Sequence, residues 1–195
     1  MNTVFIREAP LFPKKIIALA AFILVEIMMF AGLLTSFIIL KVNQFQWPPV
    51  FQPKFPLMVT GINSIILLLA GVTIHFAFSA CKNDCNYKLA FQKVFCSCFF
   101  LFVFLVVQGV EWYQLMLDGL HVRGIYGGLF VLIIGAHGLH VLLGLVVNIW
   151  LANKIRTRQL VASQLQNIDG HLSLCCIYTW FVVGLWPCIY FIVYF

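Results

Sequence analysis

The stretch IYGGLFVLIIGAHGLHVLLG, residues 125–144, decides the fold of this protein. It contains no Lys, Arg, Asp or Glu, and about 20 apolar residues are what an α-helix needs to cross the hydrocarbon core of a bilayer. His137 and His140 lie within it. A membrane helix with two imidazoles raises the question of whether they bind a metal, move a proton or only pack.

Four other blocks of the 195-residue chain have the same apolar character. Hydrophobic residues make up 63% of the chain and charged residues only 9%, whereas a soluble domain carries about a quarter charged residues. The composition therefore predicts an all-α, polytopic membrane protein, in which residues 1–195 form a single bundle of five transmembrane helices. The expected helices cover residues 16–40, 56–80, 93–116, 125–150 and 172–195.

The net charge of +6 comes from basic residues at the ends of the apolar blocks, and this scatter does not indicate nucleic-acid binding. The basic residues on the N-terminal side of the membrane are Arg7, Lys14, Lys15, Lys82, Lys88, Lys93, Lys154, Arg156 and Arg158. Those on the opposite side are Lys41, Lys54 and Arg123. By the positive-inside rule, we expect the N-terminus in the cytoplasm or organelle matrix and the C-terminus outside.

The seven cysteines form no Cys-x-x-Cys pair, and their odd number argues against a complete set of disulfides. We expect them to act as small buried apolar side chains. The sequence also shows no Walker A loop, Gly-rich dinucleotide turn, Ser-His-Asp pattern or paired-carboxylate site. Any function must therefore be sought among the polar residues inside the membrane.

Glu26, in FILVEIMMFAG, lies about ten residues from the inner end of the first helix, which places it about 15 Å deep, near the middle of the bilayer. A carboxylate there costs about 2.5 kcal/mol or more unless it is neutralised, paired or hydrated. Burial favours the protonated form. Two interpretations stay open: a group that handles protons or contacts a lipid headgroup, or a protonated side chain that hydrogen-bonds a neighbouring helix.

Glu111 lies near the outer end of the third helix, beside Gln108 and the aromatic pair Trp112 and Tyr113. Such aromatic residues are typical of the membrane interface, where a carboxylate can reach headgroup water. Between chemistry and a structural hydrogen-bonding role for Glu111, we favour the structural role.

His137 and His140 are three residues apart and share one helix face, with Cβ atoms about 5–6 Å apart. A metal site needs further ligands, and the only other intramembrane histidine is His75. No His-His pair, Cys-x-x-Cys-His or Glu-x-x-His motif accompanies the two histidines, so we predict that this chain binds no metal and no haem. We expect interhelical hydrogen bonds among small residues, with Gly128 and Gly135 on one stripe.

The motifs of the chain, taken in order, resemble subunit III of the haem-copper oxidases. LVEIMMFAG is similar to the family's SEVMFFAG, which places Glu26 on its intramembrane glutamate, and the following loop retains WPP at Trp47, Pro48 and Pro49. PLMVTGINSIILLLAGVT is similar to PLLNT…LLxSG through Asn63. Gln108 and Glu111 match the Gln and Glu of QxxEY.

The fourth and fifth helices carry the strongest part of this resemblance. GIYGGLFVLIIGAHGLHVLLG is similar to GIYGSTFF…TGFHGLHVIIG, and YTWFVVGLWPCIY is similar to YWHFVDVVWLFLY. The matching residues that we expect to support packing in these two helices are Tyr126, Gly127, Gly135, Gly138 and Trp186. Trp180 and Val183 stand where the family has His and Asp, so any proton-antenna role of that pair is absent here.

The resemblance implies the five-helix form of subunit III, which itself holds no haem and no copper. Those cofactors belong to the partner subunits, with subunit I as the main contact and subunit II as the second. Subunit III flanks them, binds phospholipid in a cleft between its helices, and supports proton uptake and the durability of the complex. The expected location is a bacterial inner membrane or the mitochondrial inner membrane.

Two alternatives remain open at this stage. The first is subunit III of a quinol oxidase, or a similar partner of a nitric oxide reductase, because other subunits bind the electron donor. The second is an independent proton-coupled carrier that uses Glu26 and His75, although the five helices show no inverted repeat.

Overall fold

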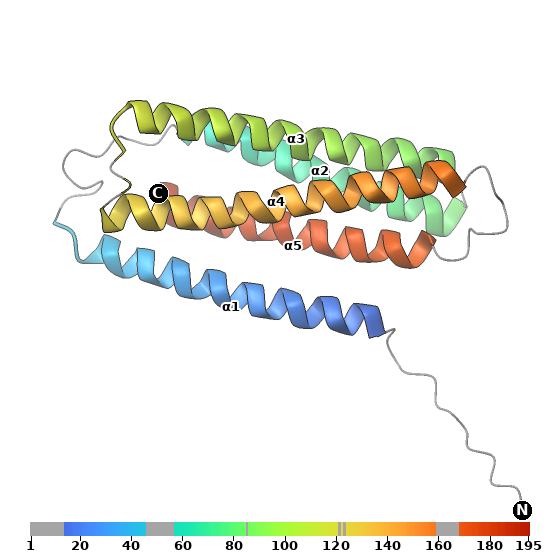
Figure 1. The fold of residues 1–195 in the computed structure, drawn as a ribbon, viewed down its shortest axis with the longest axis horizontal. Coiled ribbons are helices and arrows are strands. Elements are labelled where there is room, and N and C mark those ends of the chain that lie inside the picture. Colours follow the sequence, from blue (N-terminus) through green and yellow to red (C-terminus); the bar gives the residue numbers. More distant parts are fainter. Residues whose placement is uncertain (1–13, 46–56, 85, 121, 123, 159–167) are drawn as a thin grey trace, which may run out of the picture.

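A computed structural model describes residues 14–45, 57–84, 86–120, 122, 124–158 and 168–195. These residues form five α-helices and no strand, which confirms the predicted all-α fold (Figure 1). Each of the five is long and apolar enough to cross a membrane, so the chain is a multi-pass membrane protein. The helices are α1 (Lys14–Val42), α2 (Leu57–Asp84), α3 (Tyr87–Leu117), α4 (Ile125–Arg158) and α5 (Ile168–Tyr194).

Several helices extend beyond the apolar blocks that predict them. α3 begins at Tyr87 rather than at residue 93, and α4 continues to Arg158 rather than ending at residue 150. Hydropathy marks only the part of a helix that lies in hydrocarbon, about 20 residues, whereas α4 has 34. The first turn of α3 is closed by Asn86, whose side chain accepts a hydrogen bond from the Leu89 N–H.

Helices α2 to α5 pack together as a four-helix bundle, and α1 lies along one side of it (Figure 1). Within the described residues α1 contacts α4 and α5, but neither α2 nor α3. Its fully or nearly buried side chains are Phe30, Leu34 and Phe37. The first helix is therefore held by a narrow contact, and each polar interaction across that contact matters for its position.

The core of the four-helix bundle is filled by large side chains from facing helices. Phe104 of α3, Phe130 of α4 and Trp186 of α5 are buried, together with Leu67 of α2. The Phe104 and Trp186 rings meet edge to face, with centroids 5.1 Å apart. This packing fixes the four helices relative to one another before any polar contact is considered.

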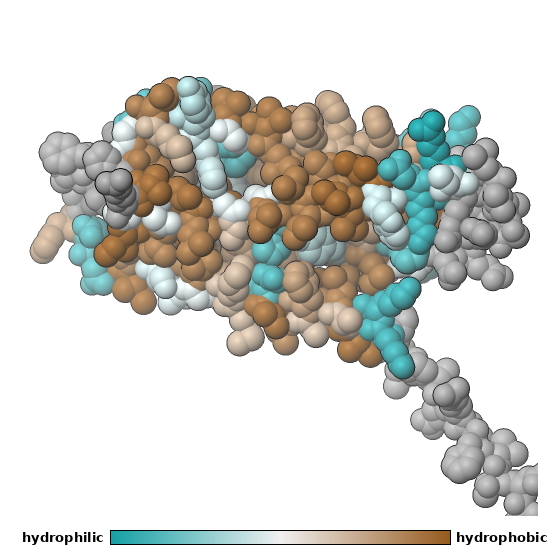
Figure 2. Space-filling view, in the orientation of Figure 1, coloured by the Kyte–Doolittle hydropathy of each residue, from teal (hydrophilic) through white to brown (hydrophobic). Residues whose placement is uncertain are grey.

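The face of the molecule in Figure 2 is mainly apolar, and hydrophilic side chains gather at the end where α1 begins. α1 begins at this end, the turn from α2 to α3 lies there, and α4 ends there (Figure 1). The described helices carry the following basic residues at this end of the bundle: Lys14, Lys15, Lys82, Lys88, Lys93, Lys154 and Arg156. The charge asymmetry predicted along the chain is thus an asymmetry between the two ends of one bundle.

Six free cysteines lie in the described residues. Cys81, Cys98, Cys175 and Cys176 are buried, as expected of small apolar side chains. Cys96 and Cys188 are exposed on the outer surface of the helices, so the expectation of burial is wrong for these two. Cys85 lies outside the described residues.

Candidate functional site

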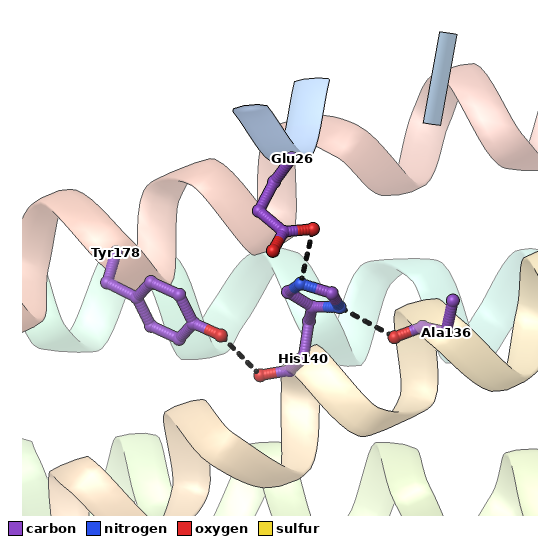
Figure 3. A network of polar contacts seen from close by, with 4 residues as sticks. All are labelled: Glu26, Ala136, His140 and Tyr178. Atoms are coloured by element: carbon purple, nitrogen blue, oxygen red, sulfur yellow. Dashed lines mark hydrogen bonds and ion pairs between the residues drawn. The ribbon is translucent and has the colours of Figure 1, made fainter. Parts of the chain in front are cut away.

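Glu26 of α1 meets His140 of α4 in the contact between α1 and the bundle. Its Oε2 atom lies 3.1 Å from Nε2 of His140 (Figure 3). The side chains are 17% and 8% exposed respectively, so the pair is largely withdrawn from lipid. Glu26 is the thirteenth residue of α1, about 18 Å along the helix. The sequence predicts the depth of Glu26, and the structure supplies its partner.

The contact of His140 Nδ1 determines whether Nε2 donates to Glu26 or accepts from it. Nδ1 of His140 lies 2.7 Å from the carbonyl oxygen of Ala136, which can only accept, so Nδ1 carries a hydrogen. In the neutral imidazole, Nε2 is then an acceptor, and a protonated Glu26 donates to it. In the charged form, His140 donates to the Glu26 carboxylate instead. Either form would place one proton between the two side chains, whose atoms lie 3.1 Å apart in a contact that does not have the geometry of a hydrogen bond.

Tyr178 of α5 and nearby aromatic rings fix the position of His140. The Tyr178 hydroxyl donates a hydrogen bond of 3.1 Å to the His140 carbonyl oxygen (Figure 3). The ring of Phe30 on α1 packs edge-on against the imidazole, with centroids 5.4 Å apart. Three helices therefore converge on one residue.

A cavity of about 360 Å³ lies between α1, α4 and α5, on the side of this pair that faces the start of α1. Phe22 and Tyr178 line the cavity near the pair: Phe22 is one turn before Glu26 on α1, and Tyr178 contacts His140. Lys15 and His171 line it near the basic end of the bundle. Trp150 also borders it, and the Lys154 amino group lies 4.5 Å from the Trp150 ring centroid. The cavity is thus apolar along its length and basic at one end.

His137 points away from this pair, although it is only three residues from His140. It is fully buried, and its ring stacks on Trp186 at a centroid distance of 4.9 Å. Neither ring nitrogen has a hydrogen-bond partner within the described residues. His140 therefore has a polar contact with another helix, through Glu26, whereas His137 has none in the described residues, because one ring faces α1 and the other faces the aromatic core.

Glu111 lies inside the four-helix bundle and is only 2% exposed, so it does not reach headgroup water there. Its Oε2 accepts a hydrogen bond of 2.9 Å from Thr60 on α2, and its Oε1 accepts one of 2.7 Å from Tyr194 on α5. The Gln108 amide donates to the same Tyr194 hydroxyl at 3.4 Å. Glu111 thereby joins three helices through neutral donors.

Asn63 and Trp186 extend the polar contacts between the same three helices. The Asn63 amide donates to the Phe104 carbonyl oxygen at 3.2 Å, and the Trp186 indole donates to Ser64 at 2.7 Å. Sequence reasoning missed Thr60, Ser64 and Tyr194. Thr60 lies three residues before Asn63 on the same face, which is the one signal that could have found it.

The remaining predicted residues fall at different kinds of position. Tyr126 and Gly127 are buried at the start of α4. Gly135 gives room to Trp112: a Cβ atom there would lie 3.1 Å from the indole. At Gly138 a Cβ atom would meet nothing within 4 Å, so Gly138 gives room to no other side chain in the described residues. Trp47 and Pro48 lie outside the described residues.

His75 is exposed on α2, a helix that does not contact α1 in the described part of the chain. Glu26 and His75, the two residues that a carrier would use, therefore lie on helices that do not meet within the described residues. No group of three His, Cys, Asp or Glu side chains in the described residues is placed to hold a metal ion.

Comparison with known families identifies the family to which the chain belongs. The family described as cytochrome c oxidase subunit III matches residues 15–195. The chain belongs to this family. The match includes all five helices, and therefore Glu26, His140 and Glu111 as well.

Relatives in the subunit III family come from bacteria, animals and archaea. Cytochrome c oxidase subunit 3 of Synechocystis sp. is 31% identical over 134 residues, which cover 68% of this chain and 56% of the relative. The Locusta migratoria protein of the same name is 34% identical over 100 residues, 51% of this chain and 37% of the relative. The heme-copper oxidase subunit I+III of Aeropyrum pernix is 29% identical over 170 residues, 80% of this chain and 21% of the relative. The matched segments span about half or less of the relatives' lengths.

Proposed function

We propose that this chain is the non-catalytic subunit III of a haem-copper terminal oxidase that reduces oxygen to water and translocates protons. The family match over residues 15–195 carries the proposal. Subunits I and II would hold the haem and copper, and subunit I would be the main contact. The Aeropyrum pernix relative, whose name joins subunits I and III, supports this placement.

The basic residues at one end of the bundle support an orientation with the N-terminus inside and the C-terminus outside. The membrane would be a bacterial inner membrane or the mitochondrial inner membrane. All five described helices would then cross it once each, and the Glu26–His140 pair would lie near its middle.

Within this role, the Glu26–His140 pair would hold α1 against the bundle and retain one proton at mid-membrane. Two features support this: among the described helices α1 contacts only α4 and α5, and Glu26 is its one carboxylate. A proton shared between oxygen and nitrogen would satisfy both groups, and the pair as a whole would carry no net charge. The pair would thereby support proton uptake and complex durability by keeping the helices in place.

A phospholipid would occupy the cavity between α1, α4 and α5. The apolar walls suit an acyl chain, and Leu19, Phe22 and Leu143 are among the residues that form them. Lys15, at the basic end, is placed to attract the phosphate. The lipid would fill space that the narrow contact of α1 leaves open.

Affinity purification of the tagged chain from its native membrane tests the proposal. We expect haem-bearing subunits to co-purify in equal amounts, with a haem absorbance spectrum and oxygen consumption. Peptide identification of these subunits, and of their copper ligands, would distinguish a cytochrome c oxidase from a quinol oxidase or a nitric oxide reductase. Recovery of the chain alone, folded and without haem-bearing partners, would contradict the proposal.

A further inference from the structure

A second cavity, of about 330 Å³, lies between α3 and α4. No described residue of α1 or α5 lines it, so it is separate from the cavity beside α1. Phe95, Phe99 and Phe102 line it from α3 and are 62%, 58% and 56% exposed, so this cavity is a groove that opens to the surroundings of the bundle. Among the described residues that line it, the polar side chains are Asn153 and Arg156 of α4.

The groove is about as long as one half of a bilayer is thick. It runs from Phe91 to Phe102 on α3, and from Leu145 to Arg156 on α4. Each span is about 11 residues or 16 Å along a helix, and half of the hydrocarbon core is about 15 Å. Phe102 is the sixteenth of the 31 residues of α3, so the groove ends near the middle of that helix. An acyl chain reaches to this depth from its headgroup, whereas a transmembrane helix would pack along the full thickness.

Both polar side chains of the groove lie at its outer end, where the basic residues of the bundle gather (Figure 1). Asn153 and Arg156 are three residues apart and therefore share one face of α4. Both are exposed, and neither side chain has a hydrogen-bond or ion-pair partner in the described residues. A guanidinium group matches the oxygen atoms of a phosphate, and an amide can donate beside it. Charge complementarity thus favours an anionic headgroup at this end.

We infer that the groove binds an anionic phospholipid, with its phosphate at Arg156 and Asn153 and one acyl chain along the phenylalanines of α3. A partner helix would need small residues for a close approach, but α3 has a phenylalanine at every fourth position from Phe91 to Phe99. This lipid is distinct from the one proposed for the cavity beside α1. The inference requires only the membrane-spanning bundle, so it does not depend on the complex to which the chain belongs.

A photoreactive phenylalanine analogue at Phe99 identifies the occupant. The protein, with any subunits that accompany it, is reconstituted into vesicles of equal parts phosphatidylglycerol and phosphatidylcholine and then irradiated. We expect Phe99 to join phosphatidylglycerol about fivefold more often than phosphatidylcholine. The same analogue at Phe191, which is exposed on α5, is the control and should join the two lipids equally. Equal yields of the two lipids at Phe99, or a crosslink to a peptide of another subunit, would overturn the inference.

Arg156→Gln tests the headgroup contact, because it removes the charge and leaves the apolar walls of the groove unchanged. The ratio of phosphatidylglycerol to phosphatidylcholine at Phe99 should fall close to one. Lys82→Gln is the matched control: it removes one positive charge at the same end of the bundle, but from α2, which does not line the groove. It should leave the ratio near its wild-type value. A ratio that survives Arg156→Gln, or that falls equally in both variants, would contradict a headgroup site at Arg156.

Lys15→Gln separates this lipid from the one in the cavity beside α1, which Lys15 lines. We expect this substitution to leave the crosslinking ratio at Phe99 unchanged, because the two cavities share no lining residue. A fall at Phe99 as large as that caused by Arg156→Gln would show that the positive potential of the whole end, and not a separate site, selects the lipid. That result would overturn the inference.

Discussion

Glu26 and Glu111 are both carboxyl groups inside the membrane, but they lie at helix contacts of different kinds. Glu111 is enclosed by α2, α3 and α5 and accepts hydrogen bonds from Thr60 and Tyr194. Glu26 joins α1 to α4 through one atom of His140. We therefore expect the number of hydrogen-bond partners, and not burial alone, to determine how much of the fold depends on each carboxyl group.

The largest loss of stability is expected from Glu111→Leu. The substitution removes the acceptor of two buried hydrogen bonds, from hydroxyl groups on two different helices, at a cost of about 2–5 kcal/mol in the free energy of unfolding. Unfolding of the purified protein in an SDS titration, followed by circular dichroism, measures this loss. Val110→Leu, on the exposed side of the same helix, is the control. Similar curves for the two variants would show that Glu111 joins nothing.

Glu26→Leu should cost less, about 1–3 kcal/mol, because only His140 Nε2 is left without a partner. The effect should be local, since α1 contacts only α4 and α5 in the part of the chain that the structure describes. Hydrogen exchange should therefore rise in α1 and its contact surface while α2 and α3 stay protected. A uniform rise in exchange across all five helices would show that Glu26, like Glu111, supports the whole bundle.

Tyr178→Phe should have a smaller effect, about 1 kcal/mol. It removes one neutral hydrogen bond, to the His140 carbonyl oxygen, and leaves the contact between Glu26 and His140 intact. The same SDS titration measures it. A loss as large as that of Glu26→Leu would indicate that Tyr178, and not Glu26, sets the position of His140.

His137→Phe should change stability least, by less than about 1 kcal/mol, because it removes two unpaired nitrogens and keeps an aromatic ring against Trp186. The matched change His140→Phe removes the partner of Glu26 and should cost about 1–3 kcal/mol. Equal effects at the two positions in the SDS titration would erase the distinction between a packing histidine and a pairing histidine.

Sequence reasoning predicts five spanning helices because apolar length alone requires them. It does not predict helix ends such as that of α4 at Arg158, since hydrogen-bonded turns continue into water. It identifies Glu26, Glu111, His137 and His140 as polar residues that need partners. It cannot pair them, because spacing along one helix says nothing about which neighbour each side chain meets.

Two partners show the limit most clearly. Tyr194 is 83 residues from Glu111 in the chain, and no local pattern links them. His140 and Glu26 are each recognisable by depth, but only the packing of α1 against α4 brings them within 3.1 Å. The family resemblance predicts the fold correctly, and it contains no geometry from which these contacts follow.

Turnover of the Glu26→Gln complex tests most directly whether the pair holds α1 in place without needing to ionise. The glutamine amide can donate to His140 Nε2 as a protonated carboxyl does. We therefore predict normal assembly, normal initial oxygen consumption and normal proton release, with Glu26→Leu losing activity earlier over many turnovers. Immediate loss of turnover in an intact Glu26→Gln complex would mean that Glu26 must ionise, and would contradict the structural role.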